Sequence, residues 1–451
     1  MPKRTRNSKG SMGLALIAAL ILPGSNLPEQ TGRDAGAVVA VRNVHVVPLD
    51  TERVDAHRTV ILRGATIERV GPADQTAIPR GATIVDGRGK YLVPGLAEMH
   101  AHLAEPGDPP GTAEAELMLF LASGVTTIRS MRGFPNHLSL RDKVARGELL
   151  GPSIIVAGPG LDSEAAKSPA EGESAVREQK RVGYDLIKVL PGLSLSTYDA
   201  IARTARELSI PFAGHIPSDV GLLHAFEAGQ QTIEHLDGYL ELLNGSKPIA
   251  RERMLDVVRR TVDTGTWNCP TLSVMEANLG LIGEADLLSR PELEYVPDAF
   301  VKLWLKFRSY GNPPRAVSEI MEANRMTLLK ALNDAGARIL LGTDSPQLFN
   351  VPGFSIRREI RLMADAGLKP YDILRSATAR VGEYTGRPCG TIKPGECADL
   401  ILLDADPLKD VQNVSRLAGV VVRGRWLPSS DLQRRLQAIR ERPGNYRRQA
   451  A

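Results

Sequence analysis

Six polar side chains stand where short apolar runs end, and their types suit metal chemistry. They are His100 and His102 in "GLAEMHAHL", Lys188 in "YDLIKVL", His215 in "PFAGHIP", His235 in "QTIEHLD" and Asp344 in "ARILLGTDS". Imidazole nitrogens and a carboxylate are ligands that zinc and similar divalent ions take in proteins. One histidine or one aspartate in such a place is more often structural, so the prediction of a metal site rests on the whole set.

Lys188 is the most unusual member of the set. On a strand it shares a face with Leu186 and Leu190, where an unpaired ammonium group is costly. His100 and His102 are two residues apart, so on a strand both side chains point to the same side. The spacing therefore allows both imidazoles to reach one site.

The elements that must position these residues indicate an α/β fold. Over residues 95–385, eight short apolar runs alternate with helical stretches such as "AEAELMLFLASG", which predicts a parallel (β/α)8 TIM-like barrel. Barrel enzymes place their chemistry at the C-terminal ends of the strands, where the six residues fall. A doubly wound sheet is the competing architecture, but no glycine-rich phosphate fingerprint opens any unit.

Both ends of the chain carry β-rich segments. Residues 37–94 and 386–428 alternate β-branched and polar residues, which predicts one small β-sandwich-like module made from both ends. Residues 429–451 indicate a C-terminal helix and a basic, solvated tail. The segment 274–337 is an insertion between the last two barrel strands. A lid or pocket wall and a packing or dimer contact are open interpretations of it.

Residues 1–30 have the pattern of a signal peptide. Basic residues precede the apolar run 12–22, which is too short to span a bilayer but fits a signal-peptide core. We therefore predict export to the periplasm or the exterior, with no stable membrane span after signal removal; an uncleaved N-terminus is the alternative. This segment carries a net +3 of the formal +4, so the remainder lacks the basic footprint of a nucleic-acid-binding protein.

Three cysteines exclude a disulfide framework. Cys389 and Cys397 flank "GTIKPGE", which suggests a tight hairpin that would bring them together. A single disulfide and two ordinary small residues both remain open at this point.

The chain after the N-terminal segment resembles the amidohydrolase superfamily, and within it the imidazolonepropionase-like and prolidase-like branch. The resemblance rests on "PGLAEMHAHL", "SGVTTIRS", "VARGELLGPSIIVAGPGL", "YDLIKVL", "AGQQTIEHLDG", "GTDS" and "GTIKPGECADLILLDADPL" in this order.

The resemblance implies a site with two divalent metal ions, zinc being the expected one. His100, His102 and Asp344 would bind the more buried ion, and His215 and His235 would bind the second. A carbamate on Lys188 would bridge both ions, since a lysine among apolar neighbours tends to lose its proton and a neutral amine reacts with carbon dioxide. A metal-bridging hydroxide would be the nucleophile, with Asp344 as general base and then acid.

Two departures from the family's pattern concern the substrate. Relatives often have "TT-x-R-D" where this chain has "TTIRSM", with Ser130 at the aspartate position. The loop "GPGLDSEAAKSP" lacks the histidine of the Gly-Gly-His loop in peptide-cleaving relatives. Tyr239, four residues after His235, is a candidate substrate contact, with a packed tyrosine as the alternative. For His137 we expect surface exposure.

The sequence thus predicts a metal-dependent amidohydrolase that cleaves an amide C–N bond in a small molecule. The substrate would be a dipeptide, an X-Pro-like peptide or an N-acyl amino acid. Hydrolysis of a cyclic amide (imidazolone- or hydantoin-like) or a lactone at the same site is the alternative, and a non-catalytic binding protein is less favoured because the ligand set is complete. The resemblance also suggests a homo-oligomer.

Overall fold

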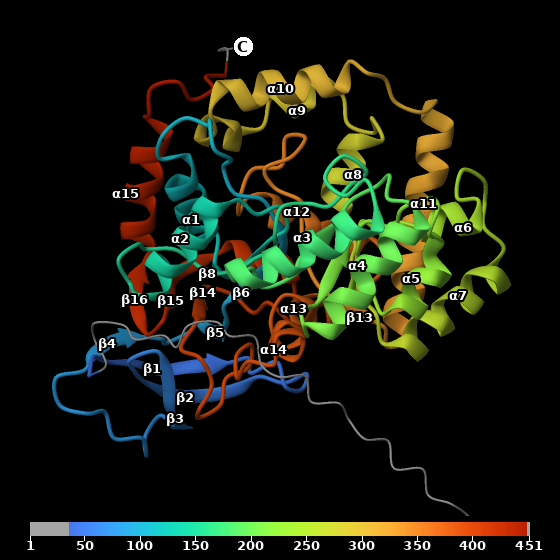
Figure 1. Ribbon diagram of the computed structural model, residues 1–451. Helices are drawn as coiled ribbons and strands as arrows, with labels where there is room; N and C mark the ends of the chain where they lie inside the picture. The colour runs from blue at the N-terminus through green and yellow to red at the C-terminus, as the bar shows by residue number, and fades with distance from the viewer. Residues whose placement is uncertain (1–35, 449–451) are drawn as a thin grey trace, which may run out of the picture.

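Strands from both ends of the chain lie in one eight-stranded sheet in the computed structural model, which describes residues 36–448 (Figure 1). The strands are β1 (Val38–Val46), β2 (Asp55–Arg63), β3 (Thr66–Pro72), β4 (Thr83–Asp86), β5 (Tyr91–Pro94), β14 (Leu400–Leu403), β15 (Leu417–Val422) and β16 (Arg425–Pro428). Their order is β16-β15-β14-β5-β1-β2-β3, with β4 paired to β1. The late strand β14 pairs with β5 in antiparallel register, Leu402 opposite Leu92, and this pairing joins the two ends of the chain.

Eight further strands, all parallel within their sheets, form the α/β part of the molecule, and each lies in a segment predicted as a strand. They are β6 (Leu96–Ala101), β7 (Val125–Ser130), β8 (Ser153–Val156), β9 (Ile187–Val189), β10 (Phe212–Gly214), β11 (Thr232–Glu234), β12 (Trp267–Cys269) and β13 (Arg338–Ile339). They form two sheets, β6-β7-β8 and β13-β12-β11-β10-β9. Isolated parallel bridges, Ala157 to Leu186 and Ala101 to Ser345, link the edges of these sheets. The arrangement is a TIM-barrel-like α/β fold.

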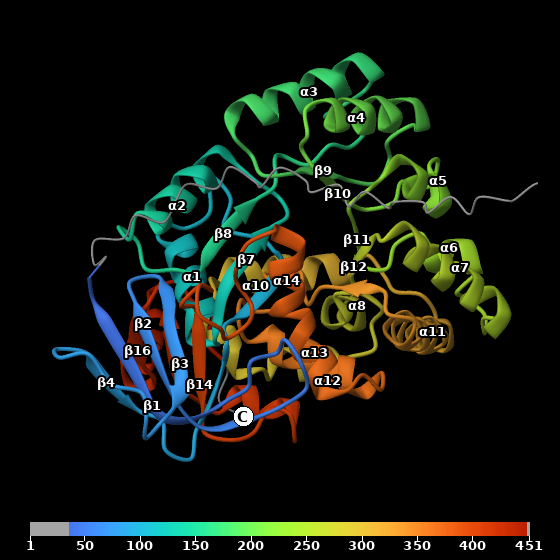
Figure 2. The same cartoon turned by 90° about the horizontal axis from the view of Figure 1, so that it is seen from below.

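Helices follow the strands and cover them from outside, as Figure 2 shows for α3, α4, α5 and α7. The helices outside the insertion are α1 (Thr112–Ala122), α2 (Pro135–Ala145), α3 (Pro169–Val182), α4 (Leu195–Glu207), α5 (Gly221–Ala228), α6 (Tyr239–Leu243), α7 (Arg251–Thr264), α12 (Ser355–Asp365), α13 (Pro370–Ser376), α14 (Ala379–Thr385), the short 3-10 helix η2 (Val411–Ser415) and α15 (Ser429–Arg440). Helix α3 illustrates how the sequence sets their ends. Ser168 caps its first turn by accepting from the Glu171 amide, and Gly183 ends it in the left-handed conformation.

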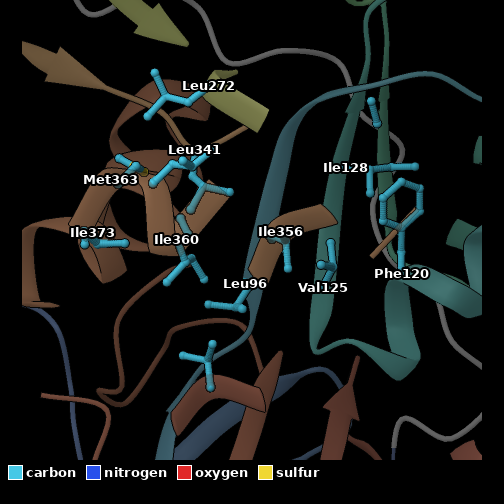
Figure 3. Packing of buried hydrophobic residues seen from close by; sticks show 14 of the residues in the cluster. Leu96, Phe120, Val125, Ile128, Leu272, Leu341, Ile356, Ile360, Met363 and Ile373 are labelled. Carbon is cyan, nitrogen blue, oxygen red and sulfur yellow. The ribbon is translucent and has the colours of Figure 1, made fainter. Parts of the chain in front are cut away.

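Apolar side chains between strands and outer helices form the largest core. Leu96, Val125 and Ile128 from β6 and β7 belong to one buried cluster with Phe120 of α1 and Ile360 of α12 (Figure 3). This packing fixes β6, which carries His100 and leads directly to His102.

The insertion is helical and packs against the body of the protein. It contains α8 (Leu272–Asn278), α9 (Glu284–Leu288), η1 (Pro291–Tyr295), α10 (Asp298–Arg308) and α11 (Arg315–Asp334). The ring of Trp304 lies 5.4 Å from that of Phe349, and Tyr295 stacks on Phe354 at 5.1 Å. These contacts support the packing interpretation of the insertion.

Residues 441–448, predicted to be a solvated tail, are mostly exposed, but they are also anchored to the insertion. The Tyr446 amide donates to the Val296 carbonyl at 3.0 Å, and the Asp298 amide donates to the Gly444 carbonyl at 2.9 Å. Glu294 accepts from Arg440 on α15 at 2.6 Å and from Arg448 at 3.1 Å. The tail is therefore fastened to the insertion, because Glu294 offsets two of its positive charges.

Cys389 and Cys397 form a disulfide with their Cα atoms 4.9 Å apart. The segment between them makes a turn rather than the expected hairpin, and Cys397 forms only an isolated bridge with Thr66. The predicted signal segment, residues 1–30, lies outside the described residues. Between residues 36 and 448, no helix has the length and apolar character that a membrane crossing requires.

Candidate metal centre

The six predicted side chains lie together at the C-terminal ends of the parallel strands. His100 is on β6, His102 directly follows that strand, and Lys188 is on β9. His215 and His235 follow β10 and β11 directly, and Asp344 follows β13 by five residues.

The distances among these side chains are those of a shared site. Nε2 of His102 lies 2.7 Å from Oδ1 of Asp344, and Nε2 of His100 lies 3.5 Å from the same oxygen. Ligand atoms of His100, His235 and Asp344 all lie within 4.8 Å of one another. The His235 ring centroid is 4.6 Å from that of His100 and 4.7 Å from that of His215.

Lys188 is buried at this centre with 1% of its surface exposed, and its Nζ has no hydrogen-bond partner within the described chain. Burial lowers the pKa of the amine, although Glu234 and Asp344 act in the opposite direction. An orphaned, buried amine is costly as it stands. It fits a position where the nitrogen carries an added group or faces further ligands.

Two glycines allow the strands to approach one another at the site. Gly214, immediately before His215, has φ +136°, and a Cβ there would lie 2.1 Å from the Val189 carbonyl oxygen and 3.1 Å from Cδ of Lys188. A Cβ at Gly342 would lie 2.9 Å from Cβ of His100. Only glycine avoids both conflicts.

Three site residues adopt the left-handed backbone conformation, which is rare outside glycine. The φ angles are +61° at His235, +46° at Thr271 and +60° at Asp344. The Asp344 amide donates to the His100 carbonyl at 2.7 Å, and the His235 amide donates to the Cys269 carbonyl at 2.8 Å. Such strain costs about 1 to 3 kcal/mol per residue and is typical of functional sites.

Three of the four histidines have a partner on Nδ1. Glu234 lies 2.7 Å from Nδ1 of His100, and Thr271 lies 2.7 Å from Nδ1 of His235. Asp237 lies 2.6 Å from Nδ1 of His215. These contacts leave Nε2 of each ring for a metal ion, which is the arrangement found around metal-bound histidine.

The protonation states also suit cation binding. Burial lowers the pKa of His100 and of His235 well below the ordinary value of 6.5, so both rings are neutral at neutral pH. Burial by itself would raise the pKa of Asp344, but the neighbouring His100 and His102 outweigh it, and the pKa falls below its usual value. Neutral imidazole and ionised carboxylate are the forms that bind metal. The donor set therefore fits divalent metal ions.

Several supporting residues were missed at the level of sequence. Glu98 on β6 accepts from the amides of His100 at 3.1 Å and Thr343 at 2.7 Å, which ties β6 to the segment that carries Asp344. Glu234 and Arg129 form a buried pair behind His100 at 2.8 Å. The sequence offered one signal for that pair: Glu234 in "TIEH" and Arg129 in "TTIRS" are charged residues within otherwise uncharged strand segments, where an unpaired charge is rare.

Three side chains singled out from the sequence are buried near the site. Tyr239 is fully buried, and its hydroxyl group lies 2.9 Å from Thr261 Oγ1 and 2.8 Å from Asn268 Oδ1, which supports the packed alternative over a substrate contact. The expectation of surface exposure for His137 is wrong: it is fully buried in α2, with Nε2 2.9 Å from the Ala104 carbonyl oxygen. Ser130, at the end of β7, is fully buried, and its Oγ has no hydrogen-bond partner among the described residues.

A family model described as the amidohydrolase family matches residues 91–427. The chain belongs to the amidohydrolase family. This confirms the predicted membership and makes the chain a metal-dependent hydrolase of carbon–nitrogen bonds that acts on small molecules. Amidohydrolases typically use divalent metal ions, and the residues described above offer suitable ligands.

Individual relatives agree with this membership. The amidohydrolase is 26% identical over 375 residues to an imidazolonepropionase of Ralstonia nicotianae, which covers 78% of this chain and 88% of that protein. Among solved structures, a bottromycin amidohydrolase matches with a TM-score of 0.71 and 25% identity over 93% of this chain and 95% of that one. A putative prolidase from Bifidobacterium longum matches in fold, with a TM-score of 0.69 and 24% identity over 89% and 99% of the two chains.

Proposed function

We propose that this amidohydrolase hydrolyses the amide bond of a dipeptide, an X-Pro-like peptide or an N-acyl amino acid. The observation that carries the proposal is the convergence of four histidines, Asp344 and the orphaned amine of Lys188 at the ends of the parallel strands. Of the two divalent metal ions, with zinc expected, one would be held by His100, His102 and Asp344 and the other by His215 and His235. Bound divalent ions polarise a substrate carbonyl and make water nucleophilic at neutral pH.

Lys188 would carry a carbamate between the two positions. Its neutral amine adds to carbon dioxide, a nitrogen–carbon bond forms and a proton is released, leaving an anionic group. The absence of a hydrogen-bond partner on Nζ and the lowered pKa of the amine support this assignment.

Asp344 would move the protons of the reaction. Its lowered pKa keeps the carboxylate ionised at neutral pH, so it can accept a proton from the attacking water. It then returns the proton to the nitrogen of the leaving group as the C–N bond breaks. General base and acid catalysis of this kind contributes about 10² to 10⁴-fold to a rate.

An assay for released amino groups tests the proposal. Zinc-loaded protein, prepared in bicarbonate, is incubated with dipeptides, X-Pro dipeptides and N-acyl amino acids. We expect cleavage of at least one class and a fall of about 10² to 10⁴-fold in kcat for Asp344→Asn, because asparagine tolerates the left-handed backbone but is a poor base. Metal-loaded protein that cleaves no linear amide would contradict the proposed substrate class.

Cyclic amides are the second candidate, because the relative that matches 78% of this chain is named an imidazolonepropionase. Imidazolone-like and hydantoin-like rings and lactones therefore form a second arm of the same assay. Ring opening without peptide cleavage, lost in Asp344→Asn, would assign this alternative.

The proposal extends to architecture and location. We propose that the two parallel sheets close into one (β/α)8 barrel spanning 95–385, supported by the bridges at both sheet edges. Residues 37–94 and 386–428 would form the sandwich-like module beside it. We further propose export directed by residues 1–30, tested by cell fractionation, and a homo-oligomer, tested by light scattering.

A further inference from the structure

A buried ion pair lies directly behind the metal centre and is bonded to one of its histidines. Oε2 of Glu234 lies 2.7 Å from Nδ1 of His100, and Oε1 of the same carboxylate accepts from Nη2 of Arg129 at 2.8 Å. The Arg129 and Glu234 side chains are fully buried, and His100 is 1% exposed.

Arg129 is held in place from three further directions. Its Nε donates to the Met99 carbonyl at 2.6 Å, and its Nη1 donates to Thr232 Oγ1 at 3.0 Å and to the Tyr384 hydroxyl at 2.9 Å. These groups come from β6, β11 and α14, so the guanidinium group has little freedom to turn. Because a guanidinium group can only donate hydrogen bonds, Arg129 holds Oε1 of Glu234 as an acceptor and leaves Oε2 facing His100.

We propose that Glu234, oriented by Arg129, is a positioning residue for the metal centre, an inference that rests on the function proposed above. The Glu234 carboxylate can only accept, so His100 must carry its proton on Nδ1 and present the lone pair of Nε2. That nitrogen faces Asp344 at 3.5 Å. The pair therefore fixes both the tautomer and the ring plane of an inner metal ligand.

Structural stabilisation alone does not account for this pair. A buried ion pair usually contributes little net stability, because desolvation offsets the attraction, and apolar residues of similar volume serve a core as well or better. Cys269 lies near enough to group with His100 and Glu234 as possible ligands. We assign that group to the support of His100, because Glu234 is already paired with Arg129.

The test measures how tightly metal is held by variants of the pair. Zinc-loaded wild type and Glu234→Gln are challenged with a chelator at pH 7.5, and zinc affinity is measured by competition. We expect zinc to bind 10 to 100-fold more weakly in Glu234→Gln, as is typical when the partner of a metal-bound histidine is changed. Glu116→Gln is the matched control: Glu116 is also buried, but it accepts from the Ala104 amide and contacts no metal ligand.

A second readout separates positioning from folding. In cobalt-substituted protein the visible absorption band reports the ligand field, and we expect it to shift in Glu234→Gln but not in Glu116→Gln. If Glu234→Gln does not fold because Arg129 is left unpaired, the double variant Glu234→Gln/Arg129→Met removes both charges and should still bind zinc about 10-fold more weakly than wild type.

The outcomes distinguish this inference from the proposed function. Wild-type affinity and an unshifted cobalt band in a folded Glu234 variant would overturn the positioning role while leaving the metal centre intact. A wild-type protein that binds no metal under these conditions would overturn the proposed function and the inference together.

Discussion

The candidate metal centre has a buried inner half (His100, Lys188 and His235) and a more exposed outer half (His102 and His215), a division that cuts across the two proposed metal positions. The two halves are built differently. His100 and Lys188 are 1% exposed and His235 is 6% exposed, whereas the side chains of His102 and His215 are 16% and 23% exposed. The partners follow the same division: Glu234 and Thr271 are fully buried, but Asp237 is 26% exposed. The inner half is therefore fixed by groups that water cannot replace, and the outer half keeps the contact with solvent that a substrate needs.

This difference has an energetic consequence. A buried donor that loses its acceptor costs about 1 to 3 kcal/mol, whereas an exposed one can bond to water instead. Changes on the inner side should therefore disturb metal binding more than equivalent changes on the outer side.

The largest effect is expected at Lys188, the inner residue with an orphaned amine. Lys188→Met removes the amine that would carry the carbamate between the two metal positions and leaves an unbranched apolar side chain. We expect fewer metal ions per chain than the two proposed for wild type. Activity should fall by more than the roughly 100-fold typical of losing an orienting partner. Elemental analysis of protein purified in bicarbonate measures the metal. Two ions per chain in the variant would rule out a bridging role for this lysine.

The two orienting partners Thr271 and Asp237 allow a direct comparison of the halves. Thr271→Val keeps the shape and β-branching of the side chain but leaves Nδ1 of His235 unpaired in a buried place. It should weaken zinc binding about 10 to 100-fold.

Asp237→Asn keeps an acceptor for His215 in a solvated place and should weaken zinc binding less than about 5-fold. Chelator competition on both variants at one pH measures the ratio of their zinc affinities. An equal loss in the two variants would mean that burial of the partner does not decide its importance.

The division into inner and outer halves could be predicted only in part from the sequence. The strands that position His100, Lys188 and Asp344 could be predicted, because short apolar runs alternating with helical stretches are a strong local pattern. Their convergence followed from the geometry of parallel strands.

The hydrogen-bond partners of these histidines could not be predicted from the sequence in the same way. Glu234 meets His100 across 134 residues of sequence, and this contact depends on the register of the strands rather than on local spacing. His137 was misjudged for a related reason, since its tertiary contact with Ala104 buries a residue whose own segment is polar. The attachment of the tail to Val296 is likewise a tertiary contact that local composition does not reveal.

A smaller effect is expected from removing residues 441–451, whose described part, 441–448, contacts the insertion. Truncation after Arg440 removes the backbone bonds of Gly444 and Tyr446 and the contact of Arg448 with Glu294. Net contributions of about 0.5 to 1.5 kcal/mol per hydrogen bond predict roughly 10-fold or greater loss of hydrogen-exchange protection over residues 291–308. Zinc content should not change. Unaltered exchange in this segment would show that the contacts of residues 441–448 do not hold the insertion.

The smallest effect on the metal is expected at Glu116, a buried carboxyl group outside the centre. Burial raises the pKa of Glu116 to about 8 from an ordinary value of 4.5, because one bond from the Ala104 amide does not offset desolvation. Between these two pH values the unfolded chain has lost the proton and the folded chain has kept it. Stability therefore falls as the pH rises from about 4.5 towards 8, by up to about 1.4 kcal/mol per pH unit, and the fall ends above 8.

Glu116→Gln cannot lose a proton, so this part of the pH dependence should disappear in the variant. Urea midpoints at pH 5 and pH 8 measure it: the variant should gain stability relative to wild type at pH 8 and hold zinc as tightly as wild type at both. Parallel curves for the two proteins would mean that Glu116 is ionised in the folded state. Glu234 differs from Glu116 in having Arg129 beside it. Comparing Glu116→Gln with Glu234→Gln therefore separates the effect of burial on a carboxyl group from the effect of its contacts with a cation and a histidine.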